Sequence, residues 1–154
     1  MNKTFIKKLL TTIIPVILVA LIGSLFVNLG MDWFNSLVKP SQWIPNWIIP
    51  VVWSIIYTIT GIILFNWVDK DEMPKSTIIL FIVNGILNIL WCLLFFTLNL
   101  TFVGLIAIIL NLIFGYLLLF NIKKYKPVYF YWLFIYPIWL SIATSLNLAL
   151  WILN

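Results

Sequence analysis

The chain has no histidine, no arginine and a single cysteine, Cys92, and only 8% of its 154 residues are charged. Without histidine or a second cysteine, it lacks the parts for a zinc site, a disulfide or histidine-dependent acid–base catalysis. Its four acids, Asp32, Asp69, Asp71 and Glu72, all lie outside the long apolar runs. Ion-coupled transporters normally place an ionisable group within the bilayer, so the sequence disfavours a proton-coupled or voltage-driven pathway.

Apolar residues are abundant, at 64% of the chain, and the mean hydropathy is +1.16. The charges bound four uncharged stretches of 23, 29, 47 and 28 residues. A membrane-spanning helix takes about 20 apolar residues. The longest stretch has a turn signal at 97–101, so it has room for two helices. We therefore expect an all-α integral membrane protein with one domain over 1–154 and spans at about 6–29, 46–68, 77–97, 101–122 and 128–151.

The lysines predict the orientation of these spans. In a five-span chain, Lys39 lies on one side of the membrane and the other eight lysines lie on the opposite side. Because cytoplasmic loops carry the excess of lysine, we expect the N-terminus in the cytoplasm and the C-terminus outside, in a cell membrane. The net charge of +5 gathers at span ends rather than along one face, so no nucleic-acid partner is expected.

The connector at 30–45 is the longest between spans. Trp33, Phe34 and Leu37 have the spacing of one face of a short helix, and Pro40 and Pro45 stiffen the return to the second span. We expect this segment to form a lid on the outer end of the bundle. Within the spans, Pro15 and Pro50 are expected to kink their helices.

Nine tryptophans fall into two groups. Six lie near span ends, where an indole ring is favoured at the lipid headgroups, and are predicted to be anchors: Trp33, Trp43, Trp47, Trp67, Trp132 and Trp151. Three lie well inside spans and need acceptors for their N–H groups: Trp53, Trp91 and Trp139. Plain helix packing and ligand contact are both open for these three.

Polar and aromatic residues repeat at helical spacing on three spans. An amide in hydrocarbon is costly unless it finds partners, so each stripe indicates either an interior pocket or hydrogen bonds between helices. The stripes are Trp53, Tyr57 and Gly61 on the second span, Asn84, Asn88 and Trp91 on the third, and Trp139, Ala143, Leu146 and Asn147 on the fifth.

Small residues on two other spans predict close helix contacts. They are Gly104, Ala107, Asn111 and Gly115 on the fourth span and Ala20, Gly23 and Ser24 on the first. A parallel homodimer and packing inside one chain both account for them, and we expect the homodimer.

Four blocks of residues, in order and with preserved spacing, resemble the tryptophan-rich sensory protein/translocator protein family, also called the peripheral benzodiazepine receptor family. They are Trp33-Phe34-x-x-Leu37-x-Lys39-Pro40 with Trp43-x-Pro45-x-Trp47; Val52-Trp53-Ser54-x-x-Tyr57-x-x-x-Gly61; Leu87-Asn88-x-x-Trp91-x-x-x-Phe95-Phe96; and Tyr136-x-x-Trp139-x-x-x-Ala143-x-x-Leu146-Asn147-x-x-x-Trp151-x-x-Asn154.

This resemblance implies a five-helix bundle, usually dimeric, with a pocket under the first loop for porphyrins such as protoporphyrin IX and haem. It also implies that pocket tryptophans take part in light-dependent porphyrin degradation in some bacterial members. The ligand-binding residues so indicated are Trp33, Trp53, Tyr57, Asn84, Asn88, Trp91, Trp139, Ala143, Leu146 and Asn147, with Trp53 and Trp139 as catalytic candidates. No metal or cofactor is required, and a porphyrin is the expected ligand or substrate.

Three functions compete on this basis. The first is a receptor or sensor that stacks a flat tetrapyrrole on aromatic faces. Lacking histidine, it would bind metal-free porphyrin at least comparably to haem. The second is an enzyme that degrades the bound porphyrin with light and oxygen. The third is a tetrapyrrole transporter, which has neither a buried charge for coupling nor a visible inverted repeat.

Overall fold

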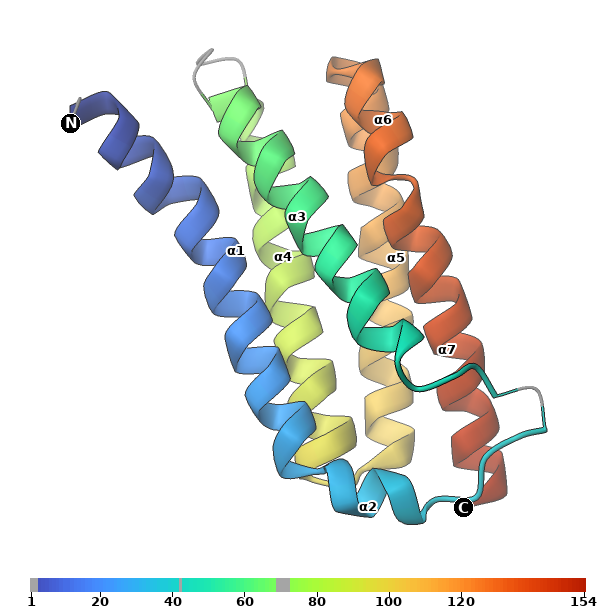
Figure 1. Cartoon of the computed structure of the whole chain (residues 1–154). Helices are drawn as coiled ribbons and strands as arrows, with labels where there is room; N and C mark the ends of the chain where they lie inside the picture. The colour runs from blue at the N-terminus through green and yellow to red at the C-terminus, as the bar shows by residue number, and fades with distance from the viewer. Residues whose placement is uncertain (1–2, 42, 69–72) are drawn as a thin grey trace.

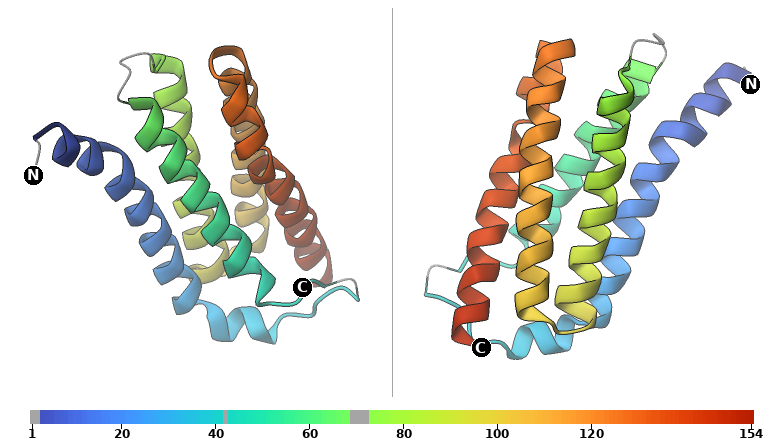
Figure 2. Two further views of the ribbon diagram at one scale, coloured as in Figure 1. Left: turned by 45° about the horizontal axis from the view of Figure 1, so that its top comes forward. Right: turned by 180° about the vertical axis from the view of Figure 1, so that it is seen from behind.

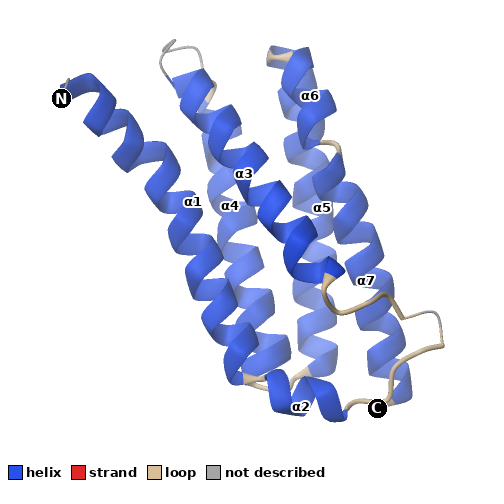
Figure 3. Ribbon diagram, in the orientation of Figure 1, coloured by secondary structure: helices blue, strands red, loops and turns tan. Residues whose placement is uncertain are grey.

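The computed structural model describes residues 3–41, 43–68 and 73–154, and within them it contains helices and connecting turns but no strand (Figure 3). Five helical segments of this described part are long and apolar enough to cross a membrane: Lys3–Leu29, Ile48–Val68, Lys75–Thr97, Thr101–Tyr125 and Pro127–Leu153. Each of the five predicted spans overlaps one of them, with ends shifted by a few residues. The all-α membrane fold expected from the charge pattern is therefore confirmed.

The bundle runs along one axis, with the two termini at opposite ends (Figure 1). Helix α1 (Lys3–Leu29) leads into the short α2 (Met31–Ser36), which crosses the end of the bundle where the C-terminus also lies. We call this the loop end, and the opposite end, where α1 begins, the lysine end. Helix α3 is Ile48–Val68. Residues 69–72 between α3 and α4, which include Asp69, Lys70, Asp71 and Glu72, lie outside the described residues.

Helix α4 (Lys75–Cys92) begins after Pro74, whose extended backbone suits the residue before a helix, and continues as a π-helical turn, η1 (Leu93–Thr97). The backbone then reverses at Asn99, which has a φ of 58°. Asparagine tolerates this left-handed conformation better than most residues. The turn predicted at 97–101 is confirmed, and α5 follows at Thr101–Tyr125.

The last span, predicted over 128–151, is not one continuous helix in the structure. It consists of α6 (Pro127–Leu133) and α7 (Ile135–Leu153), joined at Phe134. Pro137 lacks the N–H that would bond to the carbonyl of Leu133, so the regular ladder cannot run through this point. The kink expected at Pro50 is also wrong, because α3 begins at Ile48 and the proline occupies its first turn, where an N–H has no helical partner.

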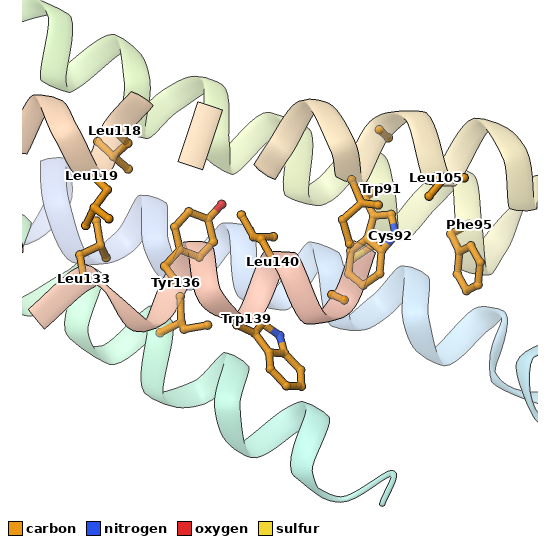
Figure 4. Packing of buried hydrophobic residues seen from close by; sticks show 14 of the residues in the cluster. Trp91, Cys92, Phe95, Leu105, Leu118, Leu119, Leu133, Tyr136, Trp139 and Leu140 are labelled. Carbon is orange, nitrogen blue, oxygen red and sulfur yellow. The ribbon is translucent and has the colours of Figure 1, made fainter. Parts of the chain in front are cut away.

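Helix α5 packs closely against its neighbours (Figure 4). A Cβ atom on Gly104 would lie 2.8 Å from the Cβ of Phe95, and one on Gly115 would lie 2.9 Å from the Cδ1 of Leu140. Ala107 and Asn111 are buried on the same helix. The small residues of this span therefore serve packing within the chain. They do not form the surface on which a homodimer was expected, and the homodimer stays a prediction.

The tryptophans near span ends differ in exposure. Trp47, Trp132 and Trp151 are exposed, as anchors at the headgroups would be. Trp67 is only 1% exposed, and its ring lies 5.8 Å from that of Tyr129 on α6. The anchor interpretation is therefore wrong for Trp67, which fills the core at the lysine end.

Candidate ligand-binding site

Two cavities lie between α1, α3 and α4, one nearer each end of the bundle. The loop-side cavity has a volume of about 380 Å³ and lies beneath α2, and the lysine-side cavity has a volume of about 500 Å³. Three side chains line both of them and so form the partition: Trp53, Tyr57 and Asn88. The stripes predicted on the second and third spans therefore converge on these two cavities, except for Gly61, which lines neither.

Aromatic rings form one wall of the loop-side cavity. Trp53 and Tyr57 are four residues apart on α3, so they lie on one face of the helix. Their ring centroids are 5.7 Å apart with an interplanar angle of 26°. Trp91 of α4 follows at 6.2 Å from Trp53, with an angle of 33°. The stacked Trp53 and Tyr57 rings and the tilted Trp91 ring give this wall a broad aromatic surface, which suits contact with a planar ligand.

Asn88 supplies the polar group of the partition. The Tyr57 hydroxyl donates to Asn88 Oδ1 at 3.3 Å, and the Cys92 thiol lies at 4.0 Å from the same oxygen. Asn88 therefore places a hydrogen-bonded amide at the boundary between the two cavities. Cys92 also lines the loop-side cavity, where it is buried.

The lid helix contributes Phe34 rather than Trp33. Phe34 is 5% exposed and lines the loop-side cavity, with its ring 5.2 Å from that of Phe96. Trp33 lines neither cavity and packs edge-on against Phe95 at 5.5 Å. Lys39 Nζ lies 4.7 Å from the centroid of the Phe34 ring. This cation–π contact holds the rest of the loop over α2. Trp33 therefore anchors the lid, and Phe34 closes the cavity.

The stripe on the last span lies away from both cavities. Asn147 accepts a hydrogen bond from Trp91 Nε1 at 3.1 Å and donates to the Ala143 carbonyl at 3.0 Å, which ties α7 to α4. Trp139 is 6% exposed, and its Nε1 has no hydrogen-bond partner among the described residues. Figure 4 shows its ring on the side of α7 toward α3. Asn147 thus supports the wall from behind, and Trp139, Ala143 and Leu146 line neither cavity.

A different residue of α7, Tyr136, reaches the lysine-side cavity. Its hydroxyl lies 3.0 Å from Asn84 Oδ1 and 3.0 Å from Asn111 Oδ1. Asn84 donates in turn to the carbonyls of Leu80 and Phe114, at 2.7 and 3.1 Å. Asn84 therefore belongs to a hydrogen-bonded network at the lysine-side cavity and does not line the loop-side cavity.

Sequence reasoning missed the contribution of α1 to the loop-side cavity. Ala20, Gly23 and Ser24, which were assigned to helix contacts, line it together with Val27 and Asn28. Their spacing of three and four residues was the available signal, but it does not distinguish a cavity wall from a dimer contact. In the described part of the chain, no three His, Cys, Asp or Glu side chains are grouped as a metal site would require.

Comparison with known proteins agrees with this architecture. Residues 11–152 match the model of the TspO/MBR family. The Tryptophan-rich protein TspO of Archaeoglobus fulgidus is 31% identical over 161 residues, covering 97% of this chain and 98% of that protein. The protein of the same name from Chlorobaculum tepidum is 31% identical over 138 residues, covering 86% of each chain. Protein CrtK of Rhodobacter capsulatus is 28% identical over 128 residues, covering 79% of this chain and 78% of that protein.

The family match spans nearly the whole chain and the five membrane helices. The resemblance inferred from the four sequence blocks is thereby confirmed. The chain belongs to the TspO/MBR family of integral membrane proteins.

Proposed function

We propose that this protein is a membrane receptor or sensor that binds a porphyrin, or another flat hydrophobic molecule, in the loop-side cavity. The observation that carries the proposal is the aromatic wall, in which Trp53 stacks on Tyr57 and lies tilted against Trp91. Each ring presents a flat apolar face, and stacking against a planar macrocycle adds to the gain from burying its surface. With the lid over it, the cavity offers such a ligand a place out of water.

The polar residues around the cavity match the amphipathic character of a porphyrin. Its macrocycle is apolar, whereas its carboxylate side chains need water or hydrogen-bond donors. Ser24, Asn28 and Asn46 line the cavity and are exposed, so the polar edge of the ligand would lie toward them. Asn88 would lie at the buried end of the ligand. We further propose that the lysine end faces the cytoplasm, in keeping with the positive-inside bias.

The donor set predicts little preference for haem over metal-free porphyrin. The chain has no histidine, and the Cys92 thiol is held near Asn88 in a buried position. No strong axial ligand is therefore expected for haem iron. Protoporphyrin IX should bind at least comparably to haem in equilibrium titrations, and a large preference for haem would contradict this account of the cavity.

The direct test is a titration of protoporphyrin IX into wild-type protein and two tryptophan variants. Trp53→Leu should weaken binding about ten-fold or more, because it removes a stacking face and its buried area. Trp139→Leu should leave affinity nearly unchanged, since Trp139 lines neither cavity. Trp132→Leu at an exposed position is the matched control. Equal affinity of wild type and Trp53→Leu, or a greater loss in Trp139→Leu, would refute the assignment.

A second candidate is light-dependent degradation of the bound porphyrin by molecular oxygen, because Trp53 and Trp91 place two oxidisable indoles beside the same cavity. Trp139, the other catalytic candidate from the sequence, lines neither cavity. Porphyrin absorbance should then fall only under light with oxygen present, and more slowly in Trp53→Phe plus Trp91→Phe at saturating ligand. Loss in the dark at the illuminated rate would exclude this mechanism.

A further inference from the structure

The lysine-side cavity differs from the loop-side cavity in where it opens. Toward the lysine end, α1 leans away from the other helices (Figure 2). On one side of the cavity lie Thr11 and Pro15 of α1, and on the other lies a stripe of α4, Ile78, Ile82 and Ile86, all of them exposed lining residues. Side chains on these positions of a membrane helix face lipid. The cavity of about 500 Å³ therefore opens sideways into the bilayer between α1 and α4.

The interior of this cavity suits hydrocarbon. Most of its lining residues are aliphatic or aromatic. Its polar groups at the deep wall largely bond to one another, as Tyr136 does with Asn84 and Tyr57 does with Asn88. The lining residues of α4 run from Ile78 to Ile89, which is about 16 Å of helix at 1.5 Å per residue. A long, narrow and apolar ligand would fill this space.

The mouth of the cavity carries positive charge. Lys7 precedes the lining residue Thr11 by one helical turn, and Lys75 precedes the lining residue Ile78 by three positions. Both lysines are exposed: Lys75 begins α4, and Lys7 lies near the start of α1. A lysine near the membrane surface attracts anionic lipid headgroups. The two lysines at the mouth therefore favour a lipid headgroup that carries a negative phosphate and no positive charge of its own.

We propose that the lysine-side cavity binds one acyl chain of an anionic membrane phospholipid, with the phosphate of its headgroup beside Lys7 and Lys75. The chain enters between α1 and α4 from the surrounding bilayer. This site is separate from the loop-side cavity and would be occupied whether or not a porphyrin is bound. The lipid fills the gap that α1 leaves at its lysine end and so completes the packing of the bundle there.

Native mass spectrometry of the full chain tests the proposal, with dioleoyl phosphatidylglycerol and dioleoyl phosphatidylcholine as probes. These lipids have the same acyl chains and differ in headgroup charge. Wild type should retain one phosphatidylglycerol more tightly than phosphatidylcholine. Lys7→Gln plus Lys75→Gln should reduce this preference, by about five-fold for each lysine. Equal retention of the two lipids by wild type would overturn the assignment of an anionic headgroup.

A matched pair of threonines on α3 tests where the acyl chain lies. Thr60 lines only the lysine-side cavity, whereas Thr58 is exposed and lines neither. Thr60→Phe should fill the space and weaken phosphatidylglycerol binding about ten-fold or more, while Thr58→Phe should not. If Thr60→Phe does not fold, Val16→Phe fills the cavity from α1 instead. Undiminished lipid retention in the folded cavity-filling variant would refute the site.

The same variants separate this proposal from the porphyrin site. Thr60→Phe should bind protoporphyrin IX as wild type does, because Thr60 does not line the loop-side cavity. Conversely, Trp91→Phe alters only the loop-side cavity and should retain phosphatidylglycerol. Loss of lipid from Trp91→Phe to the same extent as from Thr60→Phe would contradict a separate lipid site.

Discussion

Helices α1 and α5 are similar in length and apolar character but differ in how they are buried. Within the most apolar window of each, 11% of α1 and 44% of α5 is buried inside the protein. Helix α5 buries nine described residues, several of them large aliphatic side chains, whereas α1 buries only Lys8, Thr12 and Gly23. Both cavities lie on the α1 side of the bundle. The chain therefore combines a packed half, α4, α5 and α7, with a loose half, α1 and α3, that holds ligand space.

This contrast has a physical cause. In a bilayer, lipid tails are as apolar as leucine, so helices associate through close packing and hydrogen bonds rather than through removal of apolar surface from water. Helix α5 meets these needs with Gly104, Gly115 and Asn111. Helix α1 has fewer such groups, and Pro15 interrupts its ladder. It can therefore diverge from its neighbours at little cost.

The largest expected effect on this contrast comes from Gly104→Val. A Cβ there would lie 2.8 Å from the Cβ and 3.1 Å from the Cα of Phe95, and the backbone of η1 cannot easily retreat. We expect a loss of about 3 kcal/mol in unfolding free energy. Gly23→Ala in the loose half is the control, because its Cβ would meet Cys92 Sγ at an ordinary 3.5 Å. Denaturant unfolding in mild detergent measures both, and equal losses would refute the division into two halves.

The sequence predicted the spans better than it predicted the site. Charged residues and turns are excluded from the hydrocarbon core of the bilayer, so their positions in the sequence mark the ends of membrane helices. This prediction does not depend on which helices pack against one another. A stripe such as Trp53 and Tyr57 identifies a face of a helix but not what that face meets. The stripes on α3 and α4 converge on the cavities, whereas Asn147 on α7 bonds to Trp91 from behind the wall.

Two positions escaped the sequence for one reason, whereas the break in the last span did have a signal. Hydrophobicity does not separate an inward face from a lipid-facing one in a membrane protein, so the buried position of Trp67 and the cavity-lining position of Gly23 had no compositional signal. The break at Phe134 did have a signal, Pro137, three residues later. A proline affects the helix one turn before it, so the break lies at Phe134 rather than at the proline itself.

A smaller effect is expected from Tyr136→Phe in the packed half. The change removes the hydroxyl that bonds to Asn84 and Asn111 and leaves their buried carbonyl oxygens with fewer donors. We expect a loss of about 2 kcal/mol in unfolding free energy. Tyr57→Phe is the counterpart in the loose half, where the bond to Asn88 is longer, at 3.3 Å, and where the tyrosine is only half-buried, whereas Tyr136 is 6% exposed. A larger loss in Tyr57→Phe than in Tyr136→Phe would contradict the contrast.

The lid connects the two halves, and Trp33→Ala should loosen it. Trp33 packs against Phe95 of η1 but contacts neither cavity, so its loss weakens docking of α2 without removing a ligand contact. Burying one aromatic side chain contributes roughly 1–3 kcal/mol. Stopped-flow mixing with protoporphyrin IX should therefore show association and dissociation both faster by about ten-fold, with little change in affinity. Unchanged rates would mean that ligands pass between helices from the lipid.

The smallest expected effect concerns the hold of the C-terminus on the lid segment. Asn154 Oδ1 accepts from the Val38 amide at 2.9 Å, and its Nδ2 donates to the Val38 carbonyl at 3.1 Å, so the end of α7 fastens the segment that follows α2. These bonds are exposed and each contributes about 0.5–1 kcal/mol at most. Asn154→Ala should therefore raise the same stopped-flow rates only two- to three-fold. Asn66→Ala, at an exposed position near the lysine end of α3, controls for the loss of an amide. If Asn154→Ala has as large an effect as Trp33→Ala, the contact of α7 with the lid segment, and not the docking of α2 on η1, would be what keeps the lid closed.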